Sequence, residues 1–173
     1  MPVDLISRVQ YQLDLFYAPF LELGLELLAR CRDRGHSYYV LKTGGYRTFN
    51  EQMKLWLQGR TLPGKRVTNA KGGESCHNYS IAWDVCFDAD AFKSGLQPAW
   101  GKADYEVLAE EGAKIGLQVG VPGLQDYGHV QLPLASKLQR KEAECLRELK
   151  VAHNEGGLKA AWKVLDSWGP WGV

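Results

Sequence analysis

Histidines and aspartates near the middle of the chain have the residue types of a metal site. His77 and Asp84 form a His-x6-Asp pair, and Asp126 and His129 form an Asp-x-x-His pair further along. Two imidazoles and one carboxylate suit zinc and leave its fourth position open for water, as hydrolysis requires. A nearby carboxylate that is not a ligand can accept the proton of that water. The residues therefore favour a hydrolytic zinc site.

Neither pair is specific by itself, because a chain with four histidines and nine aspartates contains such spacings by chance. The surroundings of Asp84 strengthen the interpretation of these residues as a metal site. It stands in the apolar stretch 82–87, where a carboxylate is costly to bury unless a cation or hydrogen bonds compensate. His77 is expected in the loop before this strand and His129 at the start of a later one. The two pairs together indicate a metal site more specifically than either pair does alone.

Several motifs in order resemble the D-Ala-D-Ala metallopeptidase superfamily, which includes VanX- and VanY-like enzymes and phage L-alanyl-D-glutamate endopeptidases. The zinc pattern of that superfamily is SxHxxGxAxD followed by [DE]xxH. Residues 75–84 read SCHNYSIAWD and residues 126–131 read DYGHVQ. Upstream, residues 45–52 read GYRTFNEQ, similar to the family's Gly-Tyr-Arg segment. Residues 58–61 (QGRT) and 67–73 (VTNAKGG) are similar to the endolysin branch.

The resemblance implies that His77, Asp84 and His129 are the zinc ligands and that Asp126 is the general base. It also implies a fold like that of Hedgehog and the DD-peptidases.

The resemblance assigns roles to two further residues. Arg47 would contact the substrate and stabilise negative charge that develops on the scissile carbonyl. Ser75 would be a polar contact near the substrate, with a loop hydroxyl that bonds the backbone as the alternative. Ser80 stands where the family usually has glycine. If this position needs a positive φ, serine strains the turn.

Two cysteines and two further acids near the motif leave alternatives open. Cys76 and Cys86 are interpreted as small buried packing residues, because free cysteine commonly packs as one. A structural zinc site would need a fourth protein ligand, for which Cys76 is the candidate. Glu74 and Asp88 are alternative carboxylates.

The 173 residues are expected to form one α+β domain, with a small antiparallel sheet, flanking helices and a helical C-terminal region at about 136–166. A net charge of +1 gives no general attraction to nucleic acid. The expected helices are 4–17, 20–34, 50–57, 104–115, 136–149 and 157–165, the expected strands are 38–41, 81–87 and 129–132, and 61–78 is expected to be a loop.

The predicted function is a zinc peptidase that cleaves the peptidoglycan stem peptide at the L-alanyl-D-glutamate bond, as a phage or prophage endolysin in host lysis. The alternatives are a D-Ala-D-Ala carboxypeptidase or dipeptidase and a non-catalytic wall-binding module. The N-terminus has no secretory signal pattern, so the protein is expected in the host cytoplasm before lysis. We expect a monomer, with weak envelope contact through the basic C-terminal helices.

Overall fold

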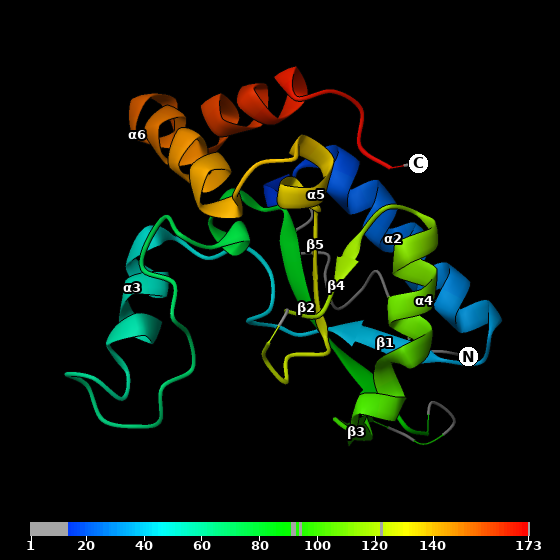
Figure 1. Cartoon of the computed structure of the whole chain (residues 1–173). Helices are drawn as coiled ribbons and strands as arrows, with labels where there is room; N and C mark the ends of the chain where they lie inside the picture. The colour runs from blue at the N-terminus through cyan, green and yellow to red at the C-terminus, as the bar shows by residue number, and fades with distance from the viewer. Residues whose placement is uncertain (1–13, 91–92, 94, 122, 173) are drawn as a thin grey trace.

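A small antiparallel sheet forms the centre of the molecule (Figure 1). The computed structural model describes residues 14–90, 93, 95–121 and 123–172. The strands follow the order β1-β2-β5-β4, and β3 pairs with β2. They are β1 (Ser37–Val40), β2 (Ala82–Asp88), β3 (Pro98–Ala99), β4 (Gln118–Val119) and β5 (His129–Gln131). The predicted fold class, an antiparallel sheet with flanking helices, is confirmed.

Register within the sheet places two of the predicted ligands side by side. β2 pairs with β5 so that Asp84 lies opposite His129. Gly128, immediately before β5, makes this approach possible, since a Cβ there would lie 2.3 Å from the Val85 carbonyl oxygen. The Val85 amide donates to the Gly128 carbonyl at 2.9 Å. The two-residue strands β3 and β4 were not predicted, because so short a segment carries no alternation pattern.

Helices surround the sheet on several sides (Figure 1). They are α2 (Ala18–Asp33), α3 (Phe49–Leu57), α4 (Glu106–Lys114), α5 (Leu134–Leu138) and α6 (Glu142–Ser167), with 3-10 turns η2 (Cys76–Tyr79) and η3 (Lys102–Tyr105). α6 breaks at Gly156 and Gly157, where φ is −151° and 68°. The helix predicted at 4–17 falls almost wholly outside the described residues. None of the described helices has the length and apolar character needed to cross a membrane.

The core lies between the sheet and α2. Trp83 on β2 is fully buried and packs edge-on against Phe16 and Phe20, with ring centroids 5.8 and 5.2 Å away. Gly24 on α2 accommodates the indole, because a Cβ there would lie 2.3 Å from it. Close packing of this kind fixes β2, and with it Asp84, relative to the rest of the fold.

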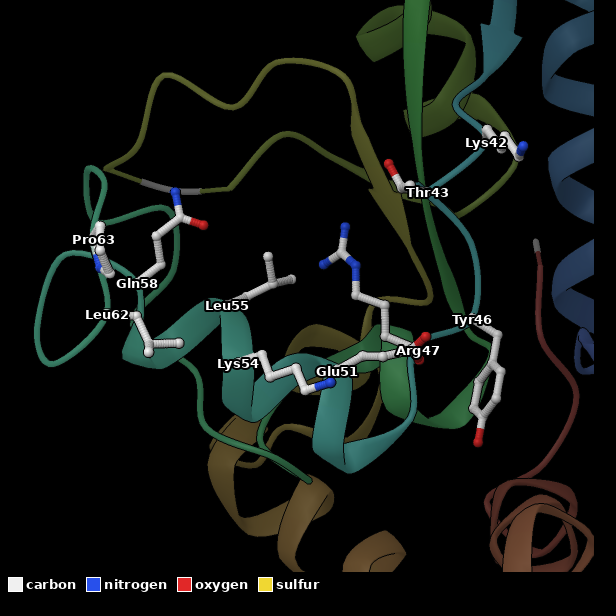
Figure 2. Close-up of a pocket in the computed structure, with 10 residues that line it drawn as sticks. All are labelled: Lys42, Thr43, Tyr46, Arg47, Glu51, Lys54, Leu55, Gln58, Leu62 and Pro63. Carbon is white, nitrogen blue, oxygen red and sulfur yellow. The ribbon is translucent and has the colours of Figure 1, made fainter.

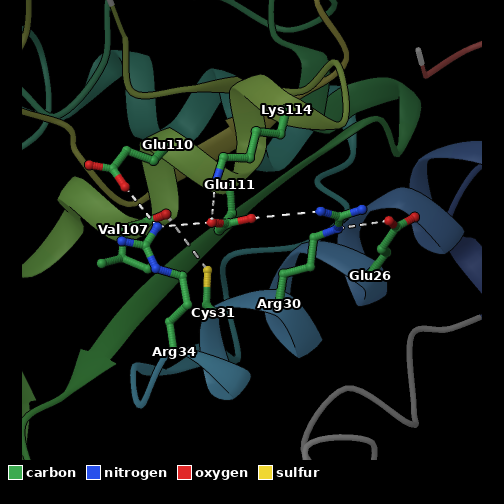
Figure 3. A network of polar contacts seen from close by, with 8 residues as sticks. All are labelled: Glu26, Arg30, Cys31, Arg34, Val107, Glu110, Glu111 and Lys114. Atoms are coloured by element: carbon green, nitrogen blue, oxygen red, sulfur yellow. Dashed lines mark hydrogen bonds and ion pairs between the residues drawn. The ribbon is translucent and has the colours of Figure 1, made fainter.

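An ion-pair network joins α2 to α4 (Figure 3). Glu111 Oε1 accepts from Arg34 Nη1 at 2.8 Å and from Lys114 Nζ at 2.7 Å. Arg30 lies 3.8 Å from the other Glu111 oxygen, and Glu110 takes a second bond from Arg34 at 2.7 Å. Glu111 itself is buried, so its partners compensate the cost of removing its charge from water.

α3 and the loop after it extend on the opposite side of the sheet from α2 and α4 (Figure 1). Thr48 and Glu51 begin the helix with a capping box, in which the Thr48 amide donates to Glu51 at 2.8 Å. Arg60 stabilises the loop by donating to the Thr68 carbonyl at 3.1 Å. Its guanidinium lies over the Trp56 ring, 4.6 Å from the centroid.

Candidate metal centre

Three of the predicted residues converge on one point at the middle of the sheet. Nε2 of His77 lies 3.2 Å from Oδ1 of Asp84, and Nδ1 of His129 lies 3.0 Å from the same oxygen. The three ligand atoms all lie within 4.8 Å of one another, and the group could hold a metal ion. Both histidines are buried, whereas the Asp84 side chain is 21% exposed. These three residues supply three ligand atoms, so a tetrahedral ion held by them would have one position left for a further ligand.

Each side chain is positioned by the local backbone. His77 belongs to η2, and its Nδ1 lies 2.9 Å from the Gly45 carbonyl oxygen. Asp84 sits within β2, where its amide donates to Gly44 at 2.8 Å and its carbonyl accepts from Leu41 at 2.9 Å. A Cβ on Gly44 would lie 2.6 Å from the Asp84 carbonyl oxygen, so this contact requires glycine.

The chemistry of the donor set fits a cation. The outward ring nitrogens, Nδ1 of His77 and Nε2 of His129, face the carbonyl oxygens of Gly45 and the Gln131 side chain at 2.9 and 2.8 Å. Such oxygens only accept, so the outward nitrogens carry the protons and the inward ones hold lone pairs. Two lone pairs and a carboxylate oxygen then meet, which is unfavourable without a cation between them. A metal ion satisfies all three.

Without a cation, a proton on either histidine takes its place beside the carboxylate. Burial alone raises the pKa of Asp84, but the charges and hydrogen bonds of His77 and His129 outweigh it and hold the pKa well below its usual range. The pKa of His77 is lowered, mainly by burial. Burial also acts to lower the pKa of His129, but Asp84 outweighs it and the pKa is raised. Asp84 is therefore ionised at neutral pH and ready to bind a cation.

Arg47 lies beside the group and contacts one of its members directly. Its Nη2 donates to Oδ2 of Asp84 at 2.6 Å. Its amide donates to the His77 carbonyl at 3.1 Å, and its own carbonyl accepts from Asn78 Nδ2 at 2.8 Å. The backbone amide and carbonyl of Arg47 are thus both hydrogen-bonded to the segment that carries His77.

Asp126 stands in the turn before β5, close enough to interact electrostatically with the group. Its pKa is raised, first by burial and second by the charge of Asp84, while His129 and His77 act in the opposite direction. Ser75 precedes η2 and its hydroxyl does not cap that turn. Asp126 therefore lies within electrostatic reach of the group, and Ser75 lies two residues before His77.

Comparison with known proteins gives a match that spans most of the chain. No protein-family model matches the chain. The peptidoglycan L-alanyl-D-glutamate endopeptidase CwlK of Bacillus subtilis strain 168 is 34% identical over 147 residues, which cover 76% of this chain and 75% of the relative. The chain belongs to the VanY-like peptidase superfamily. The superfamily expected from the motifs is confirmed, whereas its phage branch stays a prediction.

Ser80 is the clearest departure from the VanY-like zinc pattern. It adopts φ 62°, ψ 33°, the left-handed conformation that the family's usual glycine favours. The residue is fully buried, and within the described part of the chain its hydroxyl has no hydrogen-bond partner. The condition under which strain was expected, a positive φ at Ser80, is therefore confirmed.

The cysteines and other acids near the VanY-like motif do not join the group. Cys76 is buried, and burial raises the pKa of its thiol well above the usual value. Cys86 is also buried, and its Sγ lies 3.3 Å from the Phe87 carbonyl oxygen. Glu74 accepts from the Lys71 amide at 3.0 Å, and Asp88 accepts from Gln97 at 2.9 Å. Among the described residues, the group that could hold a metal contains no thiolate.

A cavity of about 570 Å³ opens beside the metal centre, between α3 and the segment that follows β1 (Figure 2). Arg47 directs its guanidinium into this space, between Leu55 on α3 and Thr43 (Figure 2). The lining is partly basic and partly apolar; it comprises Lys42, Thr43, Tyr46, Arg47, Glu51, Lys54, Leu55, Gln58, Leu62 and Pro63. Apart from Arg47, sequence reasoning assigned none of these residues to a site, although Tyr46 and Glu51 lie in the same motif as Arg47.

Two residues that are linked to His129, Gln131 directly and Glu142 through Gln131, were also missed. Gln131 was noted only as the end of the His-x-Gln motif, and Glu142 gave no signal because an acid at a helix start is common. In the structure Gln131 lies between His129 and Glu142, at 2.8 and 2.6 Å.

Proposed function

We propose that this protein is a zinc-dependent peptidase that hydrolyses the L-alanyl-D-glutamate bond of the peptidoglycan stem peptide. The observation that carries the proposal is the convergence of His77, Asp84 and His129 in a chain that is 34% identical to a peptidoglycan L-alanyl-D-glutamate endopeptidase. Zinc is proposed because two imidazoles and one carboxylate, with an open position, are typical ligands of catalytic zinc.

Zinc held by these three residues would polarise the scissile carbonyl and lower the pKa of a bound water. We assign Asp126 as the base that accepts the proton of the water at its carboxylate and returns it to the leaving amine. Arg47, which is anchored on Asp84 and projects into the cavity, would donate to the carbonyl oxygen as negative charge develops there. Ser75 is proposed as a substrate contact.

The cavity beside the centre suits an extended peptide with a carboxylate close to the scissile bond. Lys54 and Arg47 supply positive charge, while the one acidic residue of the lining, Glu51, is engaged in the helix cap with Thr48. Leu55 and Leu62 offer apolar surface for methyl groups of the peptide. A D-glutamate residue carries a free α-carboxylate next to the bond that we propose is cut, so its charge matches this lining.

Mass spectrometry of muropeptides after digestion by the zinc-loaded protein tests the proposal. The expected products are stem peptides with a new amino-terminal D-glutamate and muramyl groups that retain L-alanine. Release of free D-alanine with the L-alanyl-D-glutamate bond intact would instead assign the protein as a D-Ala-D-Ala carboxypeptidase. Intact muropeptides in the presence of bound zinc would favour the non-catalytic wall-binding module.

We further propose a role in host lysis, with the protein held in the cytoplasm until the membrane is breached. The support is the similarity of residues 58–61 and 67–73 to the endolysin branch. Expression inside a bacterium should leave cells intact until a pore-forming protein or a permeabilising agent is added. Lysis without any such agent would contradict delayed release.

A further inference from the structure

A hydrogen-bond chain connects the metal centre to the first residue of α6. Nε2 of His129 lies 2.8 Å from Oε1 of Gln131, and Nε2 of Gln131 donates to Oε2 of Glu142 at 2.6 Å. His129 and Gln131 point to the same side of β5, two positions apart, and both are buried. Glu142 comes from a separate element, so the chain joins α6 to the sheet.

The chemistry of the three groups determines which partner donates in each hydrogen bond of this chain. An ionised carboxylate only accepts hydrogen bonds, so Glu142 requires the amino group of the Gln131 amide to face it. The amide oxygen of Gln131 must then face His129, and that oxygen also only accepts. Nε2 of His129 therefore carries the proton, which leaves the lone pair on Nδ1. Nδ1 is the nitrogen that faces Asp84, at 3.0 Å.

We propose that Glu142 is a positioning residue, which acts through Gln131 to hold His129 in the tautomer that presents Nδ1 to the metal. The inference rests on the proposed role of His129 as a ligand, and it extends the site to a residue outside every motif of the family pattern. α6 then has a function beyond covering the core, because its first turn sets the proton position on a ligand. Partners of this kind commonly change metal affinity by about 10- to 100-fold.

A purely structural role for Glu142 must be separated from this one. An acidic residue in the first turn stabilises a helix through the dipole, and Glu144 in the same turn has the same charge. Glu144→Lys is therefore the matched control. It makes the same charge change in the same turn, on a residue that takes no part in the hydrogen-bond chain from His129 to Glu142. Thermal unfolding of each variant reports the structural contribution separately.

The decisive variant is Glu142→Lys, because an ammonium group only donates and so reverses the direction of the chain. The Gln131 amide would turn its amino group towards His129, and the proton would move to Nδ1. We expect zinc affinity, measured by competition with a chelator, to fall by about 10- to 100-fold. In the metal-free protein, at a pH where the ring is neutral, the ¹⁵N ring shifts of His129 should show loss of the Nε2–H form, whereas Glu144→Lys should change neither readout.

The double variant Gln131→Glu with Glu142→Lys restores the direction, since a carboxylate at 131 accepts from both His129 and the lysine. We expect it to recover zinc affinity and the Nε2–H form. Glu142→Ala, which adds no charge, should populate both tautomers and lower affinity less than Glu142→Lys does. Wild-type zinc affinity and ring shifts in both single variants would overturn the proposal, as would a double variant that folds but binds zinc no better than Glu142→Lys. Neither readout uses a peptide substrate, so failure here is distinct from failure of the proposed peptidase activity.

Discussion

Arg47 donates to the oxygen of Asp84 that the two histidines do not face. Nη2 of Arg47 lies 2.6 Å from Oδ2, whereas the nitrogens of His77 and His129 lie 3.2 and 3.0 Å from Oδ1. One oxygen of the carboxylate therefore faces the guanidinium, and the other faces the metal position. This arrangement fixes the orientation of Asp84 and, in the mechanism that we propose, places a permanent positive charge next to the carbonyl oxygen that gains negative charge.

Replacement of Arg47 by alanine should reduce kcat/KM by about 100- to 1,000-fold, the usual cost of removing one donor to a developing oxyanion. Zinc should stay bound, because the substitution removes a cation and leaves all three ligand atoms. Arg47→Lys should recover little activity, since an ammonium group lacks the planar fork that spans two acceptors. Kinetics on a defined muropeptide, with zinc content measured in parallel, provide the check. Loss of zinc in Arg47→Ala would show that the residue serves the ligand rather than the substrate.

Substitution of Asp126 by asparagine should lower kcat by about 100- to 10,000-fold, the contribution typical of a positioned base. The amide keeps the shape of the side chain but cannot accept the proton, so zinc affinity should change little. Asp90→Asn, which alters an acid outside the group, is the matched control. Lytic activity that survives in zinc-loaded Asp126→Asn would refute the assignment of this residue as the base.

The candidate ligands could be predicted because their spacing lies in short contiguous motifs. His77 and Asp84 belong to one segment, and the pairing of β2 with β5 brings Asp84 opposite His129. The orientation of the rings could not be predicted, because the bond of His77 to Gly45 and the bond that turns the Gln131 amide towards Glu142 both join separate elements of the fold. Sequence identifies residue types, whereas the choice of ring nitrogen is a property of the folded environment.

Two longer elements, α2 and β2, were predicted closely, whereas the helix expected over 136–149 is divided at residues 139–141 into α5 and α6. α2 begins two residues before its predicted start, and β2 is shifted by one residue from its predicted range. β3 and β4 each contain two residues and are defined by pairing with β2 and β5, so no local sequence pattern predicts them. The cavity near Arg47 likewise combines α3 with the segment after β1, which lie apart in the sequence.

Ser80→Gly should stabilise the protein by about 1 kcal/mol. It removes the cost of a left-handed conformation and of a buried hydroxyl without a partner, which together outweigh the added flexibility of glycine in the unfolded chain. Gln139 also has a positive φ, of 50°, but is exposed, so Gln139→Gly measures the conformational part alone. Urea unfolding of both variants gives the comparison. A Ser80→Gly variant less stable than wild type would show that the hydroxyl contributes more than this account allows.

Lys54→Ala should weaken recognition of a free carboxylate next to the scissile bond. Wild-type protein is expected to prefer stem peptides with free D-glutamate over those in which the α-carboxylate is amidated, because Lys54 and Arg47 line the cavity. Loss of one exposed charge contact, worth about 1 kcal/mol, should raise KM for the free acid about fivefold and leave the amidated substrate unchanged. Lys102→Ala, at a site outside the cavity, should leave both values unchanged. An equal change for both substrates would contradict a carboxylate contact.

Stability at acidic pH should depend on Glu111. Hydrogen bonds from Lys114 and then Arg34 lower the pKa of this carboxyl from 4.5. A group whose pKa falls on folding contributes stability above its unfolded pKa, and that contribution disappears as pH falls through the lower native pKa. The unfolding free energy of wild-type protein should therefore fall between pH 4.5 and the lowered value more steeply than that of Glu111→Gln. Glu110→Gln, which removes only the exposed partner of Arg34, should keep most of the wild-type slope; identical slopes for wild type and Glu111→Gln would exclude Glu111 as the source.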